Sequence, residues 1–119
     1  MDRNRRSPAS FLPLRPVEFH ILLSVARGER HGYGILQDVE AREEGTPPDV
    51  GTLYRALRRL REQGLITESA APAGEPSSDE RRNYYRATSF GLEVGRAEAR
   101  RLDRLMRAAR AGGLLEGVA

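Results

Sequence analysis

Two arginines near the middle of the chain have a spacing suited to contacting nucleic acid. Arg55 and Arg58 lie three residues apart, so on a helix they project from the same side. The planar guanidinium group of arginine matches both phosphate oxygens and the edge of guanine in a major groove. The segment 51–61 contains four arginines and no acidic residue, which predicts an electropositive face. A solvated helix surface would have the same composition, so this face does not identify a ligand by itself.

The start of the same segment has groups that favour an anion. Asp49 is suited to cap the helix, because its carboxylate can accept hydrogen bonds from the first-turn amides. Thr52 lies in that first turn, where the amides and the positive end of the helix dipole favour phosphate. Tyr54 and Arg59 are expected on the flanks of the arginine face. The opposite side of the helix is predicted to be buried and consists of Leu53, Ala56, Leu57 and Leu60.

A second basic segment belongs to a predicted β-hairpin. Strands are predicted at about 65–67 and 83–87, with the Ala-, Pro-, Gly- and Ser-rich residues 70–80 as the tip. Arg81 and Arg82 follow the tip, and from a hairpin beside DNA they can bind phosphate oxygens. A charged hairpin with no ligand explains this segment equally well in isolation.

The two tyrosines of the returning strand, Tyr84 and Tyr85, are adjacent in the sequence. Alternation along a strand places them on opposite faces, with one in the core and one at the surface. The sequence does not say which of the two is buried.

Residues that would support catalysis or metal binding are absent or poorly spaced. His20 and His31 are the only histidines, they lack metal-ligand spacing, and the chain contains no cysteine. The serines lie in no nucleophile motif, and the chain has no phosphate-binding glycine loop. We therefore predict no catalytic residue, no metal site and no cofactor.

The composition is typical of one small globular domain. The 119 residues are 39% hydrophobic and 31% charged, and all 20 basic residues are arginine, giving a net charge of +3. The arginine content permits nucleic-acid binding, although GC-rich coding produces the same bias. The absence of cysteine fits a cytoplasmic protein, and no apolar run is long enough to span a membrane.

Helical periodicity predicts three short helices before the hairpin. The first begins at Pro16 and ends near Ala26, and the second covers about 32–43. The third follows Asp49 and ends at Gly64. A tight connection between two short helices leaves the outer face of the second one free to enter a major groove.

A long helix is predicted after the hairpin, capped by Thr88 and running from about Phe90 to Arg110, before Gly112. Its length is roughly 30 Å. One side is apolar, and without a further domain to cover it this side favours a dimer interface, although the helix could instead fold back on its own domain. The residues predicted to form the dimer interface are Val94, Leu102, Leu105, Met106 and Ala109.

This order of elements predicts a mainly α chain with a small β-hairpin, arranged as a winged helix-turn-helix with a long C-terminal dimerisation helix. We expect residues 1–13 to be a flexible N-terminal arm and residues 14–88 to be the DNA-binding domain. Residues 89–111 would form the dimerisation helix and residues 112–119 a tail.

Several segments resemble the PadR family of bacterial regulators. They are His-Gly-Tyr-Gly-Ile at 31–35, Gly-Thr-Leu-Tyr-Arg-Ala-Leu at 51–57, Gly-Leu-Ile at 64–66, and Arg-Arg-Asn-Tyr-Tyr-Arg-Ala-Thr at 81–88 followed by Gly91. The resemblance covers about residues 14 to 110. It implies a winged helix-turn-helix regulator, usually a repressor, in which the C-terminal helix pairs two subunits. The short C-terminal region is similar to the smaller branch of the family, which has a single helix there.

The resemblance also assigns roles to individual residues. Those in the matching recognition helix are Thr52, Tyr54, Arg55 and Arg58, and those in the matching wing are Arg81 and Arg82. Tyr33 opens the supporting helix, where its hydroxyl can touch phosphate or its ring can pack on the first helix. The chain departs from the family pattern at Ala87, where Leu is usual, and at Asp49-Val50, where Ser-Pro is usual.

These observations predict a regulator that binds double-stranded DNA as a homodimer, with two inverted half-sites roughly 34 Å apart. The alternative is a winged-helix adaptor that binds protein and not DNA. Regulators that the chain resembles often respond to small aromatic or drug-like molecules near the dimer interface, but the sequence says neither whether this chain has an effector nor what it would be. With aromatic residues at only 6% of the chain, few side chains are available to stack on one.

Overall fold

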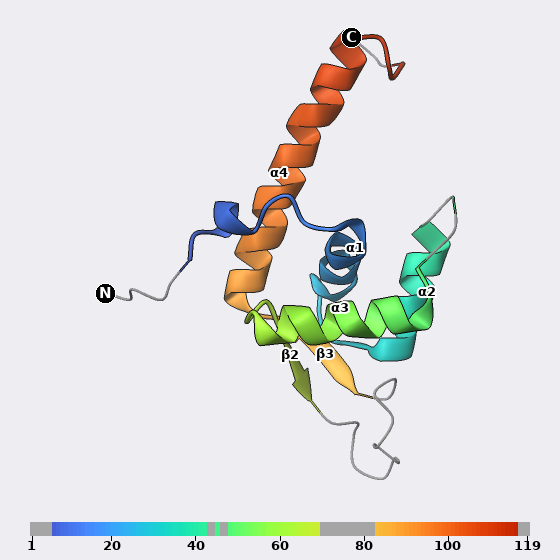
Figure 1. Cartoon of the computed structure of the whole chain (residues 1–119), viewed down its shortest axis with the longest axis vertical. Helices are drawn as coiled ribbons and strands as arrows, with labels where there is room; N and C mark the ends of the chain where they lie inside the picture. The colour runs from blue at the N-terminus through green and yellow to red at the C-terminus, as the bar shows by residue number, and fades with distance from the viewer. Residues whose placement is uncertain (1–5, 43–44, 46–47, 70–82, 117–119) are drawn as a thin grey trace.

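The computed structural model describes residues 6–42, 45, 48–69 and 83–116 (Figure 1). These residues form a three-helix body with a small sheet on one side and a long final helix. The elements in chain order are the 3-10 helix η1 (Pro8–Phe11), α1 (Pro16–Val25), β1 (Arg30–His31), α2 (Gly32–Arg42), α3 (Val50–Glu62), β2 (Ile66–Ser69), β3 (Tyr84–Ala87) and α4 (Ser89–Ala111).

The core lies where α1, α2 and α3 meet the start of α4. The apolar residues of α3 all point into it, as their helical spacing predicted: Leu53, Ala56, Leu57 and Leu60 are at most 2% exposed. Ile21 of α1 and Ile35 of α2 are fully buried against them. Burial of this apolar surface is the main force that holds the three helices together.

Both ends of α3 follow from local sequence. The Asp49 side chain caps the helix by accepting a hydrogen bond from the Thr52 amide at 2.8 Å, as predicted. At the other end, Gly64 has a φ of 81°, a left-handed conformation that glycine adopts without steric cost. This turn sends the chain directly into β2.

The sheet has three strands, one more than the predicted hairpin. Its order is β1-β3-β2, and both pairings are antiparallel. Sequence analysis missed β1, which contains only Arg30 and His31 and pairs with Tyr85 and Tyr84. Tyr85 is the buried tyrosine at 3% exposure, whereas Tyr84 is half-buried on the other face.

The segment before α1 differs from the flexible arm that was expected for residues 1–13. Residues 8–11 form η1, which packs against α4, and the Phe11 ring meets the Phe90 ring edge-on at a centroid distance of 5.4 Å. Leu14 is buried, and its amide donates a hydrogen bond to Glu98 Oε2 at 3.2 Å. Residues 1–5 lie outside the described part of the chain.

The final helix begins in the core and ends far from it. Thr88 caps it by accepting a hydrogen bond from the Gly91 amide at 2.9 Å, and the helix then continues to Ala111, well beyond the three-helix body (Figure 1). Close packing at its start requires glycine, because a Cβ atom on Gly91 would lie 1.9 Å from the Leu65 carbonyl oxygen. Among the described helices, none has the length and apolar character needed to cross a membrane.

Candidate nucleic-acid interface

The arginine face predicted on α3 is exposed in the structure. Arg55 and Arg58 both lie at the surface, on the side of the helix opposite the buried Leu53, Leu57 and Leu60. Figure 1 shows α3 across one side of the body, with β2 and β3 beside it. The hairpin therefore lies next to the helix that carries the arginine face.

The first turn of α3 brings a carboxylate and a guanidinium together. Hydrogen bonds from the Thr52 amide and then the Thr52 hydroxyl lower the pKa of Asp49, and the nearby charge of Arg55 lowers it further. Arg55 donates from Nη2 to Thr52 Oγ1 at 3.2 Å, and its Nη1 would lie 3.2 Å from a Cβ atom on Gly51. The Arg55 guanidinium thus lies over the turn where a phosphate is expected to bind, beside an ionised acid.

Two residues expected on the flanks of this face are placed differently. Tyr54 is only 7% exposed and belongs to the core, so its predicted flank position is wrong. Its neighbour in sequence, Leu53, is at the centre of the buried stripe, and the tyrosine ring extends the apolar surface by one position. Arg59 is half-buried and donates from Nε to Glu18 Oε2 at 2.8 Å. That contact directs its guanidinium toward α1.

The start of α2 adds an exposed tyrosine beside this surface. Tyr33 is 46% exposed, so its phenol ring is accessible rather than packed under α1. Arg30 of β1 fixes the backbone here by donating to the Gly34 carbonyl at 3.3 Å and to the Asp38 carboxylate at 2.6 Å. The hydrogen bond from Arg30 is the main cause of the lowered pKa of Asp38.

The outer face of the hairpin carries exposed polar side chains. Thr67 and Arg86 face each other across β2 and β3, and both are exposed. On the same face, the Tyr84 ring lies 5.3 Å from the His31 ring. Arg86 was not singled out as a site residue from the sequence, because its exposure follows from the burial of Tyr85, which only the structure shows. Arg81 and Arg82, the predicted wing contacts, lie outside the described residues.

The inner face of the hairpin is tied to the end of α3 by one acid. Glu68 accepts hydrogen bonds from Arg61 and Asn83, and from the Tyr85 hydroxyl at 3.5 Å. Arg61 is on α3, whereas Asn83 and Tyr85 are on or next to β3. The position of the hairpin relative to α3 is therefore fixed by charged hydrogen bonds as well as by apolar packing.

The five residues predicted to form a dimer interface divide into two groups. Val94 is fully buried in the core of its own domain, so its predicted place on an outer face is wrong. Leu105 and Met106 are 46% and 41% exposed, and Leu102 and Ala109 are half-buried along the projecting part of α4. This stretch is an apolar stripe that the described residues leave uncovered.

An apolar groove lies between α1 and the first half of α4. It has a volume of about 220 Å³, and Leu22, Leu23, Leu92 and Ala99 contribute to its lining. Leu23 is 46% exposed at its edge. The groove and the projecting stripe of α4 are therefore two apolar surfaces that the described residues leave exposed.

Comparison with known proteins places this geometry among bacterial regulators. The family model described as the transcriptional regulator PadR-like family matches residues 21–99. A PadR family regulator from Clostridium difficile R20291 has 29% sequence identity and a TM-score of 0.60, with 77% of this chain and 95% of that chain covered. A PadR family regulator from Eggerthella lenta DSM 2243 has 27% identity and a TM-score of 0.62, with 93% and 87% covered.

A third structure supports the fold alone. It is a transcriptional regulator from Clostridium thermocellum with 24% identity and a TM-score of 0.65, and the comparison covers 80% of this chain and 87% of that one. A search of curated proteins found no match.

Proposed function

This chain belongs to the PadR-like family of transcriptional regulators, and from that membership we propose that it is a repressor that binds an inverted DNA repeat as a homodimer. Its winged-helix fold and family make it a DNA-binding regulator. The operator architecture, the homodimer and the sign of regulation are the proposed parts. We further propose that it works in the cytoplasm and catalyses no reaction.

The observation that carries the proposal is the two-sided character of α3. Its leucines are buried against the body, whereas Arg55 and Arg58 are exposed on the opposite side with the hairpin next to them. A helix held in this way can enter a major groove with its arginines toward the bases.

The structure supports a contact set that is narrower than the one predicted from sequence. We assign Arg55 and Arg58 to the major groove, and the Thr52 hydroxyl to phosphate. Tyr33 would contact the phosphate backbone from the start of α2, and Arg86 from the hairpin, together with Arg81 and Arg82. Tyr54 is assigned to the core and Arg59 to the contact between α3 and α1.

The homodimer is proposed from the two uncovered apolar surfaces. The exposed stripe of α4, which contains Leu105 and Met106, would pack on a second copy of the chain. It would reach the groove between α1 and α4 of that copy. Two-fold symmetry buries both stripes at once and presents two copies of α3, which would meet half-sites roughly 34 Å apart.

Binding-site selection with the purified protein tests the DNA-binding proposal. We expect recovery of an enriched inverted repeat, with affinity lowered by Arg55→Ala or Arg58→Ala and unchanged by Arg100→Ala, an exposed arginine on α4. A base contact is worth about 1–3 kcal/mol. Selection that enriches no sequence would contradict the proposal and favour a winged-helix adaptor.

Sedimentation velocity tests the homodimer separately. Leu105→Asp would place a charge in the proposed interface, so we expect a monomer with an unchanged helix content by circular dichroism. Leu114→Asp is the matched control, since Leu114 is 84% exposed and lies beyond α4. A dimer that survives Leu105→Asp, or a wild-type monomer, would contradict this interface.

A further inference from the structure

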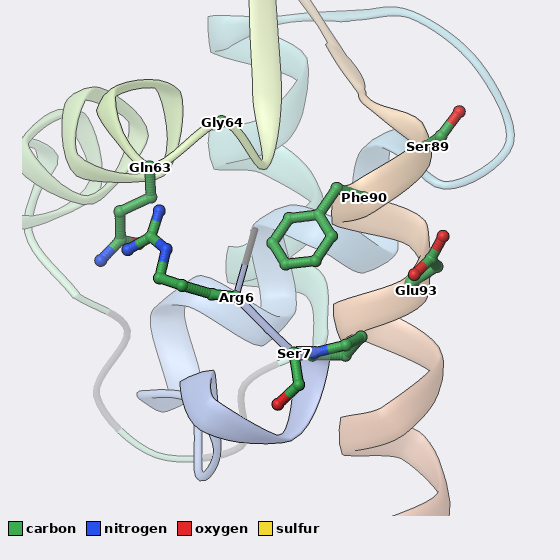
Figure 2. Close-up of a pocket in the computed structure, with 8 residues that line it drawn as sticks. Arg6, Ser7, Gln63, Gly64, Ser89, Phe90 and Glu93 are labelled. Carbon is green, nitrogen blue, oxygen red and sulfur yellow. The ribbon is translucent and has the colours of Figure 1, made fainter. Parts of the chain in front are cut away.

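A second cavity lies at the junction of η1, the end of α3 and the start of α4, on a different side of α4 from the apolar groove. Its volume is about 710 Å³, within the range of sites that hold small molecules. Figure 2 shows Phe90 in the middle of the lining residues, with Arg6 and Gln63 on one side and Glu93 on the other. The cavity thus combines an aromatic wall with opposite charges.

The aromatic wall is held in place by its neighbours. The Phe90 ring packs edge-on against Phe11 at 5.4 Å, which limits its rotation. The Arg6 guanidinium lies 4.7 Å from the centre of the Phe11 ring, so the cation is also positioned before any ligand arrives. A flat apolar molecule can contact this wall with little rearrangement of the protein.

The two charges at the cavity are available to a ligand. Several other acids are paired with arginine, as Glu18 is with Arg59 and Glu68 with Arg61. Within the described residues, by contrast, neither Arg6 nor Glu93 has an ion-pair partner. A carboxylate near Arg6 and an ammonium group near Glu93 would complement both.

We propose that this cavity binds a small aromatic zwitterion, a molecule with a flat ring, a carboxylate and an amine. The ring would lie on Phe90, the carboxylate beside Arg6 and the ammonium group beside Glu93. Gln63 and the hydroxyls of Ser7 and Ser89 supply further polar contacts at the rim.

The cavity is connected to the proposed DNA-binding helix, so this part of the inference rests on the proposed function. Gln63 ends α3, and its amide donates to the Arg59 carbonyl at 3.0 Å. Thr88, which caps α4, donates from Oγ1 to the Gly64 carbonyl at 2.7 Å. A ligand that contacts Gln63, Gly64 and Glu93 therefore bridges α3 and α4, and its occupancy is coupled to DNA binding.

The ligand class is tested by NMR titration of the full chain with para-(aminomethyl)benzoate, in the absence of DNA. We expect shifts at the Gly64 amide and the Gln63 side chain, and tighter binding than for para-methylbenzoate or para-methylbenzylamine, each of which lacks one charge. An exposed ion pair contributes about twofold to fivefold in affinity. A zwitterion that binds no more tightly than both analogues would overturn the proposal.

Charge-removing variants assign the two contacts. Arg6→Gln should abolish the advantage of the zwitterion over the amine, and Glu93→Gln should abolish its advantage over the acid. Arg100→Gln, on the same helix but outside the cavity lining, should leave both advantages intact. Persistence of both advantages in the two cavity variants would place the ligand elsewhere and overturn the site.

A separate measurement tests the coupling. The affinity for a selected DNA site, with and without saturating zwitterion, should differ by about fivefold or more in the wild type and less in Arg6→Gln. Unchanged DNA affinity would overturn the coupling while the NMR result still decides the site. Failure to bind any DNA would instead contradict the proposed function and leave the ligand titration as a valid test.

Discussion

Arg59 of α3, the proposed recognition helix, donates a hydrogen bond from Nε to Glu18 Oε2 of α1 at 2.8 Å. The other oxygen of Glu18 accepts the Arg15 amide at 3.0 Å, at the start of α1. One buried carboxylate therefore joins the beginning of α1 to the last turn of α3. This contact helps to hold α3 against the body. It also gives Arg59 a structural role, whereas Arg55 and Arg58 are exposed at the surface.

The first prediction concerns the different roles of Arg59 and Arg55. Arg59→Ala should lower the free energy of unfolding by about 1–3 kcal/mol, because the buried Glu18 carboxylate loses its charged partner. Its effect on the salt dependence of DNA binding should be negligible. Arg55→Ala, which removes a proposed base contact, should instead weaken binding to the selected DNA site by about 1–3 kcal/mol. A smaller slope of log K against log salt for Arg59→Ala would show that Arg59 contacts DNA.

The second prediction concerns the acid at the start of α3. Asp49→Asn keeps a side-chain oxygen for the Thr52 amide but removes a negative charge next to Arg55. We expect tighter DNA binding, with the gain shrinking as salt is raised, because the charge lies at the surface. Glu62→Gln, at the far end of α3, is the matched control and should have a smaller effect. Equal or weaker binding by Asp49→Asn would show that the carboxylate does not face DNA.

The third prediction concerns pH and Glu98. Hydrogen bonds from Arg101, together with one from the Leu14 amide, lower the pKa of this buried carboxyl below its usual value of 4.5. Because the folded-state pKa is the lower one, the stabilisation is complete above about pH 4.5 and is lost as the pH falls through the folded-state pKa.

Urea denaturation of Glu98→Gln tests this dependence. At neutral pH we expect a loss of about 1–3 kcal/mol, because the amide cannot replace a carboxylate beside Arg101. The difference from wild type should shrink in acid as the wild-type carboxyl becomes protonated. A difference that stays constant down to the acid transition would contradict the assignment.

The fourth prediction compares two glycines of α4. Gly91→Ala should destabilise the protein by about 3 kcal/mol or more, because its Cβ would lie 1.9 Å from the Leu65 carbonyl oxygen, which is backbone and cannot rotate away. Gly95→Ala places its Cβ 3.9 Å from the Leu22 side chain, an ordinary contact. It should be neutral or stabilising by up to about 1 kcal/mol, since alanine favours a helix interior. Equal unfolding midpoints for the two variants would contradict this packing.

The elements that depend on short-range patterns were predictable from the sequence. The Asp49 and Thr88 caps and the turn at Gly64 use contacts within a few residues, and all three were found where predicted. The leucine stripe of α3 was equally clear, because four residues share one helical period. The fold class followed from these elements and their order.

The features that were missed depend on distant parts of the chain. A two-residue strand such as β1 has no periodicity of its own and exists because His31 finds Tyr84 across the sheet. Residues 8–11 are ordered by packing on α4, about eighty positions away in the sequence. Val94 shares its helical face with Leu102 and Leu105, so no pattern could show where α4 leaves the body and the same face becomes exposed.

In the proposed dimer, the uninterrupted course of α4 makes it a molecular ruler. Val94 and Glu98 anchor its first half in the domain, while Leu105 and Met106 lie on the free half, and the residues between them set both separation and rotation. One inserted residue would move the free half by about 1.5 Å and turn it by about 100°. In a dimer built on this helix, the number of residues between Glu98 and Leu105 would therefore set the distance between the two copies of α3 on DNA.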